Sequence, residues 1–381
     1  MEATNLTYLS IGSNLGDRFL NIQEVLFHIH KEIGEVHATS HVYESASWGF
    51  KGEDFYNVCI ALRTTLHPPN LLDRMLSIEK RLGRIRQNTR EYVSRTVDID
   101  ILYYENEIID TDQLTIPHPK LHERRFVLRP LADIAPQHYH PILKKDTRNL
   151  LQECKDKNIP KKTNRALFPS RKALFSNVQF IAIEGNIGAG KTTLAKRMST
   201  DFNGKLVLER FAENPFLPKF YEDRSRYAFP LEMSFLADRY QQFTDDTSQF
   251  DLFRNFMISD YDIYKSLIFA QITLQKEEFE LYRKVFDFMY KEVKKPQIYV
   301  YLYQTTERLL ENIKRRGRDY ERNIGSDYLE KINRGYFDFL KSYPKENCLI
   351  IDISEMDFVA NRDDYNTVVR TIQNFALGQG N

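Results

Sequence analysis

Cysteine and long apolar runs are scarce in this chain of 381 residues. The three cysteines, Cys59, Cys154 and Cys348, lie far apart and are odd in number, so they fit neither a disulfide framework nor a zinc site. This usage favours a reducing compartment, and we expect a cytoplasmic protein. No apolar run approaches the roughly 20 residues that cross a bilayer. The first residues also lack the basic and apolar regions of a signal peptide, so we expect no membrane association.

A dominant sign of charge is also lacking. The chain has 54 Lys+Arg, 53 Asp+Glu and a formal net charge of +1, and its composition of 42% hydrophobic and 28% charged residues excludes wholesale disorder. One uncompensated basic cluster lies in residues 161–177. We interpret it as a solvated linker and expect no nucleic-acid partner. The length favours two domains, here predicted at residues 1–160 and 178–381.

Apolar periodicity in the first half predicts an α+β domain. Alternating or β-branched segments predict strands, and apolar residues at helical spacing predict two helices. The resulting order is βαββαβ, which is typical of a ferredoxin-like antiparallel sheet with two helices on one face. The predicted strands cover residues 6–14, 41–45, 56–64 and 97–104, and the helices cover residues 21–33 and 71–82.

Two aspartates in this half suggest a metal–phosphate site. Asp98 and Asp100 are two residues apart in a predicted strand, so they project from the same face. Buried together, they need compensation, which a hard divalent cation supplies. Arginines before and after this strand suit a magnesium–polyphosphate ligand. Taken alone, however, the pair is more typical of an edge strand with surface ion pairs.

The motifs around these aspartates appear in a known order. They are GSN at 12–14, FYN at 55–57, IEKRLGRIR at 78–86, RTVDIDI at 95–101 and IPHPKLHERRFVLRPL at 116–131. Residues 4–155 thereby resemble 6-hydroxymethyl-7,8-dihydropterin pyrophosphokinase of the folate pathway. The resemblance implies diphosphate transfer from ATP to the pterin, with Mg²⁺ held by Asp98 and Asp100. It also implies pterin contacts by Phe55, Asn57 and Phe126, catalytic arginines Arg84 and Arg95, and ATP contacts by Glu79, Arg86, His118 and Arg124.

The second half begins with a phosphate-binding loop. A short apolar strand leads into GNIGAGKT at residues 185–192 and then into a helix, which is the context of the Walker A pattern. Its glycines let backbone N–H groups turn toward phosphates, Lys191 reaches the β- and γ-phosphates, and the Thr192 hydroxyl can bind Mg²⁺. We predict an ATP site in a P-loop α/β fold with a parallel sheet. Its residues are Gly185, Asn186, Ile187, Gly188, Ala189, Gly190, Lys191, Thr192 and Thr193.

Segments after the loop indicate which type of reaction the ATP site serves. They include ENPFLPKFYED at 213–223, DRYQQ at 238–242 and RRGRDYE at 315–321. Residues 178–360 thereby resemble the bacterial deoxyadenosine/deoxyguanosine kinases. The resemblance implies that Glu209 is the base at the 5′-hydroxyl. It also assigns Tyr221 and Glu321 to the sugar, Glu232 to the nucleobase, Asp260 to the acidic motif, and Arg315, Arg316 and Arg318 to a lid over ATP.

One departure leaves alternatives open. The family's acid-Arg-Ser motif is here Asp260-Tyr261-Asp262, so its arginine is absent, and Arg239 is a candidate substitute. The second domain could therefore be a non-catalytic nucleotide-binding module, or a thymidylate-type kinase with a similar loop and lid. A carboxylate at Glu232 only accepts hydrogen bonds, which favours purine deoxynucleosides. Relatives of the kinase dimerise, so we expect a homodimer through this domain.

Overall fold

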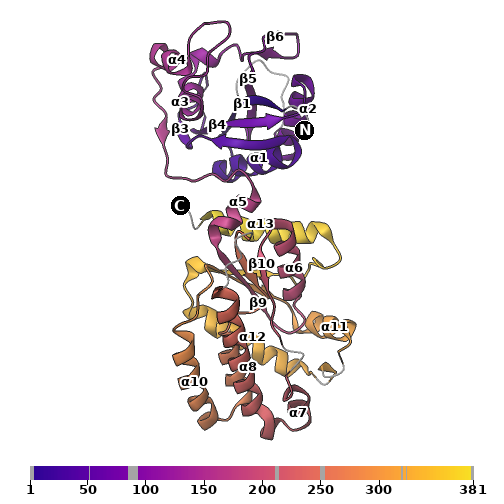
Figure 1. Cartoon of the computed structure of the whole chain (residues 1–381). Coiled ribbons are helices and arrows are strands. Elements are labelled where there is room, and N and C mark those ends of the chain that lie inside the picture. Colours follow the sequence, from indigo (N-terminus) through magenta and orange to yellow (C-terminus); the bar gives the residue numbers. More distant parts are fainter. Residues whose placement is uncertain are drawn as a thin grey trace. The chain divides into compact units, whose positions relative to one another are not determined.

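The computed structural model describes residues 4–50, 52–84, 93–210, 214–248, 254–318, 321–322 and 324–378. It divides into two compact units, which we call unit 1 (residues 1–173) and unit 2 (residues 174–379) (Figure 1). Unit 1 contains an antiparallel sheet and unit 2 a parallel one. This confirms the two fold classes expected from the order of elements.

The sheet of unit 1 has the strand order β5-β1-β4-β3-β8, and β2 also pairs with β4. All these pairings are antiparallel. The sequence analysis missed β2, where Val36 is the one buried position and the apolar alternation is therefore weak. The strands are β1 Asn5–Ser13, β2 Gly34–Thr39, β3 Tyr43–Ser45, β4 Phe55–Thr64, β5 Asp98–Tyr104 and β8 Lys161–Lys162, beside a separate pair, β6 Ile109–Asp110 and β7 Thr115–Ile116.

Helices cover both faces of this sheet rather than the one face predicted. The helices α1 (Arg18–Glu32) and α2 (Pro68–Arg81) pack against β1, β4 and β5. On the other face, α3 (Arg125–Ile134) contacts residues of β1 and β4 such as Tyr8 and Ala61. Both faces need a cover because successive residues of β1 and β4 are apolar and buried. A 3₁₀ turn, Leu121–Glu123, and α4, Thr147–Glu153, complete the unit.

The segment predicted to be a solvated linker is packed. β8 pairs with β3, and the Gln23 side chain exchanges hydrogen bonds of 2.7 and 3.0 Å with the backbone of Phe168. The guanidinium of Arg165 lies 4.9 Å from the ring centre of Phe19. Helix α5 (Arg171–Val178) then buries Phe175 within unit 2. Arg165 and Arg171 of this segment therefore stack on aromatic rings, whereas Lys161, Lys162 and Lys172 are exposed.

Unit 2 is built on a sheet with the strand order β10-β11-β9-β12-β13. Because all neighbours are parallel, the strand ends that carry functional groups meet at one edge. The strands are β9 Phe180–Gly185, β10 Lys205–Val207, β11 Met257–Ser259, β12 Ile298–Tyr303 and β13 Cys348–Asp352. The helices are α6 Lys191–Phe202, α7 Leu217–Glu222, α8 Arg224–Ser248, α9 Lys265–Thr273, α10 Lys276–Tyr290, α11 Thr306–Arg316, α12 Ser326–Ser342 and α13 Arg362–Gly378, with a 3₁₀ turn at Lys345–Asn347.

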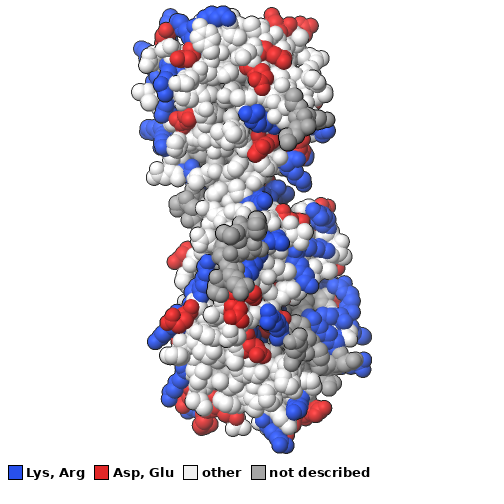
Figure 2. All heavy atoms as spheres, in the orientation of Figure 1, with Lys and Arg blue, Asp and Glu red and all other residues white. Residues whose placement is uncertain are grey.

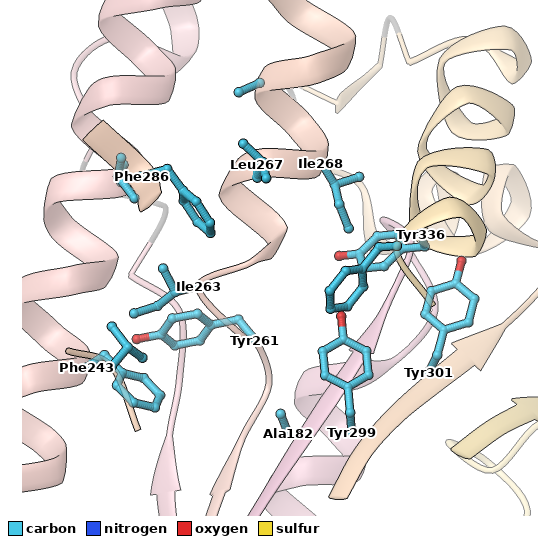
Figure 3. Packing of buried hydrophobic residues seen from close by; sticks show 14 of the residues in the cluster. Ala182, Phe243, Tyr261, Ile263, Leu267, Ile268, Phe286, Tyr299, Tyr301 and Tyr336 are labelled. Atoms are coloured by element: carbon cyan, nitrogen blue, oxygen red, sulfur yellow. The ribbon is translucent and has the colours of Figure 1, made fainter. Parts of the chain in front are cut away.

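Tyrosine and phenylalanine fill much of the core of unit 2. Figure 3 shows Tyr299, Tyr301 and Tyr336 packed together, and Tyr261 lying near Phe243. Tyr261 is fully buried in this core. In the described ranges, no helix is both long and apolar enough to span a membrane.

Candidate active sites

The two aspartates of unit 1 lie at the beginning of β5, where Asp98 pairs with Gly12 and Asp100 with Ser10. The Arg95 guanidinium lies 3.1 Å from the Asp98 carboxylate, and Arg84 also donates to Asp98. On the other side, the Arg124 guanidinium lies 3.8 Å from Asp100. The structure thus brings together the predicted carboxylates and three of the predicted arginines.

Electrostatics at this pair fit a divalent cation. Burial, and then the neighbouring charge of Asp98, raise the pKa of Asp100 to about 7. Arg124 and Arg95 oppose that rise without cancelling it. A cation between the carboxylates would relieve both causes. Within the described ranges, no group of three or more His, Cys, Asp or Glu residues could hold a metal. Mg²⁺, however, is usually bound by only one or two carboxylates of the protein, together with substrate phosphates and water.

Aromatic side chains form the walls of the hollow above these aspartates. Phe55 and Phe126 line it as predicted, and Asn57 reaches it from β4 while its amide donates to Ser45 Oγ at 2.9 Å. Trp48 and Phe50 line it too and were missed by the sequence analysis. Trp48 is the only tryptophan in the sequence, which was the available signal. Such walls suit a flat heterocycle, since aromatic rings prefer stacked or edge contacts.

Two of the predicted ATP contacts, Glu79 and His118, do not line the hollow. Glu79 is buried, accepts from the Ile99 N–H at 2.9 Å and also accepts from Arg84, so it positions that arginine. Burial, and then the charge of Arg124, lower the pKa of His118 to about 4, which leaves its ring neutral at physiological pH. Arg86 lies outside the described residues.

The phosphate-binding loop of unit 2 joins β9 to α6 with the predicted geometry. Gly188 and Gly190 have φ angles of 88° and 84°, in the left-handed region that favours glycine. The Lys191 ammonium donates to the carbonyl oxygens of Gly185 and Asn186 at 2.9 and 3.0 Å. Burial, and then the charge of Lys265, lower the pKa of Lys191 to about 8. An anion such as a phosphate would stabilise both ammonium groups.

Two cations hold the predicted base. Arg239 donates to Glu209 Oε1 from Nε at 2.9 Å and from Nη2 at 2.6 Å, while Lys265 donates to Oε2 at 2.7 Å. Burial alone would raise the pKa of Glu209, but Lys265 and Arg239 outweigh it and hold this pKa well below its usual range. These two cations therefore favour the carboxylate form of Glu209.

Asp260 connects this base to the phosphate-binding loop. Its Oδ1 accepts from the Glu209 backbone N–H at 2.8 Å, and its Oδ2 accepts from the Thr192 hydroxyl. A hydroxyl and a carboxylate side by side at this edge of the sheet are the donors that Mg²⁺ takes in P-loop enzymes. Asp260 thus extends the metal site that the sequence predicted at Thr192 alone.

Two cavities meet at these groups. One is lined by the residues 188–193 of the loop and by Arg308, Asn312 and Arg315 of α11. The other is lined by apolar side chains of α7, α8 and α9 and by Glu232 and Glu321. Seven residues line both cavities: Gly188, Lys191, Thr192, Glu209, Asp260, Arg316 and Arg318.

The lid arginines differ in their partners. Arg316 donates to Glu321 from two nitrogens, and Arg318 lies 3.4 Å from the same carboxylate. Arg315 is mostly exposed and lies 3.7 Å from Asp357. Lys and Arg side chains gather over α11 on the face drawn in Figure 2. The side chain of Tyr221, which was predicted at the sugar, lies outside the described residues.

The residue at the motif-arginine position makes no contribution to the cavities. Tyr261 is buried in the core near Phe243 (Figure 3). Arg239 and Lys265 provide the positive charge instead. Lys265 was missed because nothing in the sequence indicates that the first residue of α9 faces the end of β10.

Each unit matches a known protein family. Residues 8–136 match the family model 7,8-dihydro-6-hydroxymethylpterin-pyrophosphokinase, and residues 181–377 match the model deoxynucleoside kinase. Deoxyguanosine kinase from Bacillus subtilis is 37% identical over 51% of this chain and 96% of that protein. The 2-amino-4-hydroxy-6-hydroxymethyldihydropteridine pyrophosphokinase from Aquifex aeolicus is 39% identical over 40% of this chain and 92% of that protein. The folic acid synthesis protein FOL1 from Dictyostelium discoideum is 44% identical, over 36% of this chain and only 21% of its own length.

Proposed function

Because residues 8–136 belong to the 7,8-dihydro-6-hydroxymethylpterin-pyrophosphokinase family and residues 181–377 to the deoxynucleoside kinase family, we propose that this chain carries out two ATP-dependent transfers, one in each unit. Unit 1 transfers a diphosphate from ATP to the hydroxymethyl group of the dihydropterin and releases AMP. Unit 2 transfers the γ-phosphoryl group to the 5′-hydroxyl of a deoxynucleoside and releases ADP.

In unit 1 the aromatic hollow above a carboxylate pair supports the proposal. Phe55 and Phe126 stack against the pterin, and Asn57 hydrogen-bonds to its edge. Mg²⁺ held by Asp98 and Asp100 would supply the positive charge that draws ATP to them. Arg84 and Arg95 orient the phosphates and stabilise negative charge as it moves.

In unit 2 the observation that carries the proposal is the meeting of the two cavities. ATP occupies the cavity at the phosphate-binding loop, and the nucleoside occupies the apolar one. The γ-phosphoryl group and the 5′-hydroxyl then meet at Glu209, Lys191, Arg316 and Arg318, which line both cavities. Glu209 accepts the hydroxyl proton, and the cations stabilise the transferring group. Mg²⁺ at Thr192 and Asp260 would neutralise phosphate charge.

Catalysis is favoured over a non-catalytic binding module. That alternative came from the missing motif arginine, and Glu209 has two buried cations without it. We propose purine deoxynucleosides as substrates, because Glu232 can accept from the donors of a purine edge and the relative from Bacillus subtilis is named a deoxyguanosine kinase.

Assembly and location are also part of the proposal. Leu281 and Phe288 lie seven residues apart on α10 and are 54% and 78% exposed, so an apolar stripe faces solvent. We propose that this stripe pairs two kinase units in a homodimer. The three cysteines are free, which suits the reducing cytoplasm.

A chromatographic assay that separates AMP from ADP tests both activities. The protein is incubated with Mg·ATP and, in turn, hydroxymethyldihydropterin, each deoxynucleoside and thymidine monophosphate. We expect AMP with the pterin and ADP with deoxyguanosine or deoxyadenosine. Asp100→Asn should abolish only the AMP and Glu209→Gln only the ADP, so each variant is the control for the other. ADP formed only with thymidine monophosphate would instead indicate a nucleotide kinase.

A further inference from the structure

Two glutamates line the apolar cavity of unit 2 in opposite surroundings. Glu209 has two cations, as described above. Glu232 is 3% exposed, and no cation lies within ion-pair distance of its carboxyl group in the described part of the chain. Its Oε1 lies 2.9 Å from the Thr273 hydroxyl, and its Oε2 is buried without a hydrogen-bond partner.

The nearest cations are committed to other groups. Arg239 donates to Glu209 from Nε and Nη2 and to Ser266 from Nη1 at 2.6 Å. Lys265 donates to Glu209. The Tyr282 hydroxyl of α10 reaches the backbone carbonyl of Glu232, not its carboxyl group. The other titratable groups lining the cavity are Lys191, Asp260, Arg316, Arg318, Glu321 and Tyr328.

The surroundings of Glu232 favour its neutral form, because a buried carboxylate without a cation beside it is costly. The Thr273 Oγ1 lies 2.9 Å from both the Phe269 carbonyl oxygen and Glu232 Oε1. When the Thr273 hydroxyl donates to Oε1, the unpartnered Oε2 is the oxygen that can carry a proton. Consistently, burial raises the pKa of Glu232 to about 7, although Arg239 opposes this rise.

Resting on the kinase function proposed above, we propose that Glu232 selects the purine by its protonation state, binding adenine as a carboxylic acid and guanine as a carboxylate. With Thr273 donating to Oε1, the acid proton lies on Oε2, which has no other partner among the described residues, and Glu232 lines the cavity. The acid then offers a donor beside an acceptor, which complements adenine N1 and N6–H. The carboxylate offers acceptors only, which complement the adjacent N1–H and N2–H donors of guanine. Binding deoxyguanosine to the acid form therefore releases one proton.

Calorimetry of the full-length protein without ATP tests this proposal. Deoxyguanosine or deoxyadenosine is titrated at pH 6, 7 and 8 in buffers of different ionisation enthalpy, which gives the number of protons released per nucleoside bound. At pH 6 we expect nearly one proton for deoxyguanosine and nearly none for deoxyadenosine. The ratio of the two affinities should shift toward deoxyguanosine by about tenfold per pH unit, the limit for one titrating group. Equal proton release, or a ratio independent of pH, would overturn the proposal.

Two variants assign the effect to Glu232. Glu232→Gln places a permanent donor beside an acceptor. The variant should therefore still bind deoxyadenosine, bind deoxyguanosine more weakly, and show an affinity ratio that is independent of pH. Thr273→Val removes a hydrogen bond that lowers the pKa of Glu232. This pKa should therefore rise, and the pH at which the two deoxynucleosides bind equally well should move to a higher value. An unchanged pH dependence in Glu232→Gln would overturn the proposal. Binding of both purines with a flat ratio contradicts this inference alone, whereas no binding of any deoxynucleoside contradicts the kinase function as well.

Discussion

At the scale of residues, the environment of each carboxyl group decides its chemistry. Glu209, Glu232 and Asp100 are all acidic residues near a predicted site, yet cations hold only the first as a carboxylate. Burial keeps the pKa values of the other two near 7. Glu232 has no ion-pair partner in the described part of the chain, so burial raises its pKa. At Asp100, burial and the charge of Asp98 together outweigh Arg124 and Arg95. Similar side chains thus acquire different pKa values from their surroundings.

Lys265 is predicted to be a positioning residue for Glu209. Lys265→Met should lower kcat/KM for the deoxynucleoside on the order of 10²-fold, as expected when a base loses its orientation and charge. Because Lys265 is the largest cause that lowers the pKa of Glu209, this pKa should rise in the variant, and the acidic limb of the pH profile should lie at higher pH than in the unaltered protein. Steady-state kinetics between pH 4 and 8 measure both effects. Exposed Lys345 gives the control, Lys345→Met, which should change neither. An acidic limb unchanged in Lys265→Met would contradict the prediction.

From the raised pKa of Asp100 we predict that the Mg²⁺ requirement of unit 1 depends on pH. Its pKa is raised to about 7, so below that pH a proton competes with the metal. The Mg²⁺ concentration for half-maximal AMP formation should therefore rise as pH falls from 8 to 6, approaching tenfold per unit. Asp98→Asn removes the charge next to Asp100. It should make the Mg²⁺ requirement less dependent on pH and should also weaken Mg²⁺ binding. A requirement that stays constant with pH in the unaltered protein would rule the prediction out.

At the scale of elements, the local chain path places the reacting groups. The phosphate-binding loop needs left-handed glycines between β9 and α6, and the parallel sheet brings the ends of β9, β10 and β11 together. Motif spacing predicted these elements well because the loop is local. It failed at β2 and at the second face of the sheet in unit 1, where pairing and covering depend on distant partners.

Gly190 tests the loop. It has a φ of 84°, and a Cβ there would lie 2.7 Å from the Phe358 ring. Gly190→Ala should therefore destabilise the kinase unit by the roughly 1–2 kcal/mol of a left-handed residue and weaken ATP binding. Thermal unfolding with and without ATP measures the effect. Gly325 has a φ of −92° and open space at its Cβ position, so Gly325→Ala is the matched control and should be neutral. Equal stability of the two variants would contradict this account.

At the scale of the whole molecule, two folds of different class occur in one chain, each with its own ATP chemistry. Their connecting segment, residues 161–177, is partly packed, because Arg165 and Arg171 find aromatic and acidic partners, while its three lysines are exposed. Charge counting could not show this, since the partners lie more than 100 residues away in the sequence.

The stripe of Leu281 and Phe288 predicts the assembly. A charge in an apolar interface is costly, so Phe288→Asp should convert a homodimer into a monomer. Light scattering coupled to size exclusion measures the mass directly. Lys345→Asp, at another exposed position, should leave the dimer intact. A monomeric mass for the unaltered protein would show that the stripe has another role.

The sequence by itself was enough to identify both families and both fold classes. It also supplied nearly all of the candidate residues for binding phosphate, pterin or metal. These features are local. A loop of eight residues, or two aspartates on one strand, can be recognised from neighbouring residues of the sequence alone. Only the tertiary structure decided which cations pair with Glu209, which aromatic side chains complete the hollow above Asp98 and Asp100, and which carboxyl groups have a raised pKa. Those outcomes depend on distances between elements far apart in the chain, because charge and burial act through space rather than along the sequence.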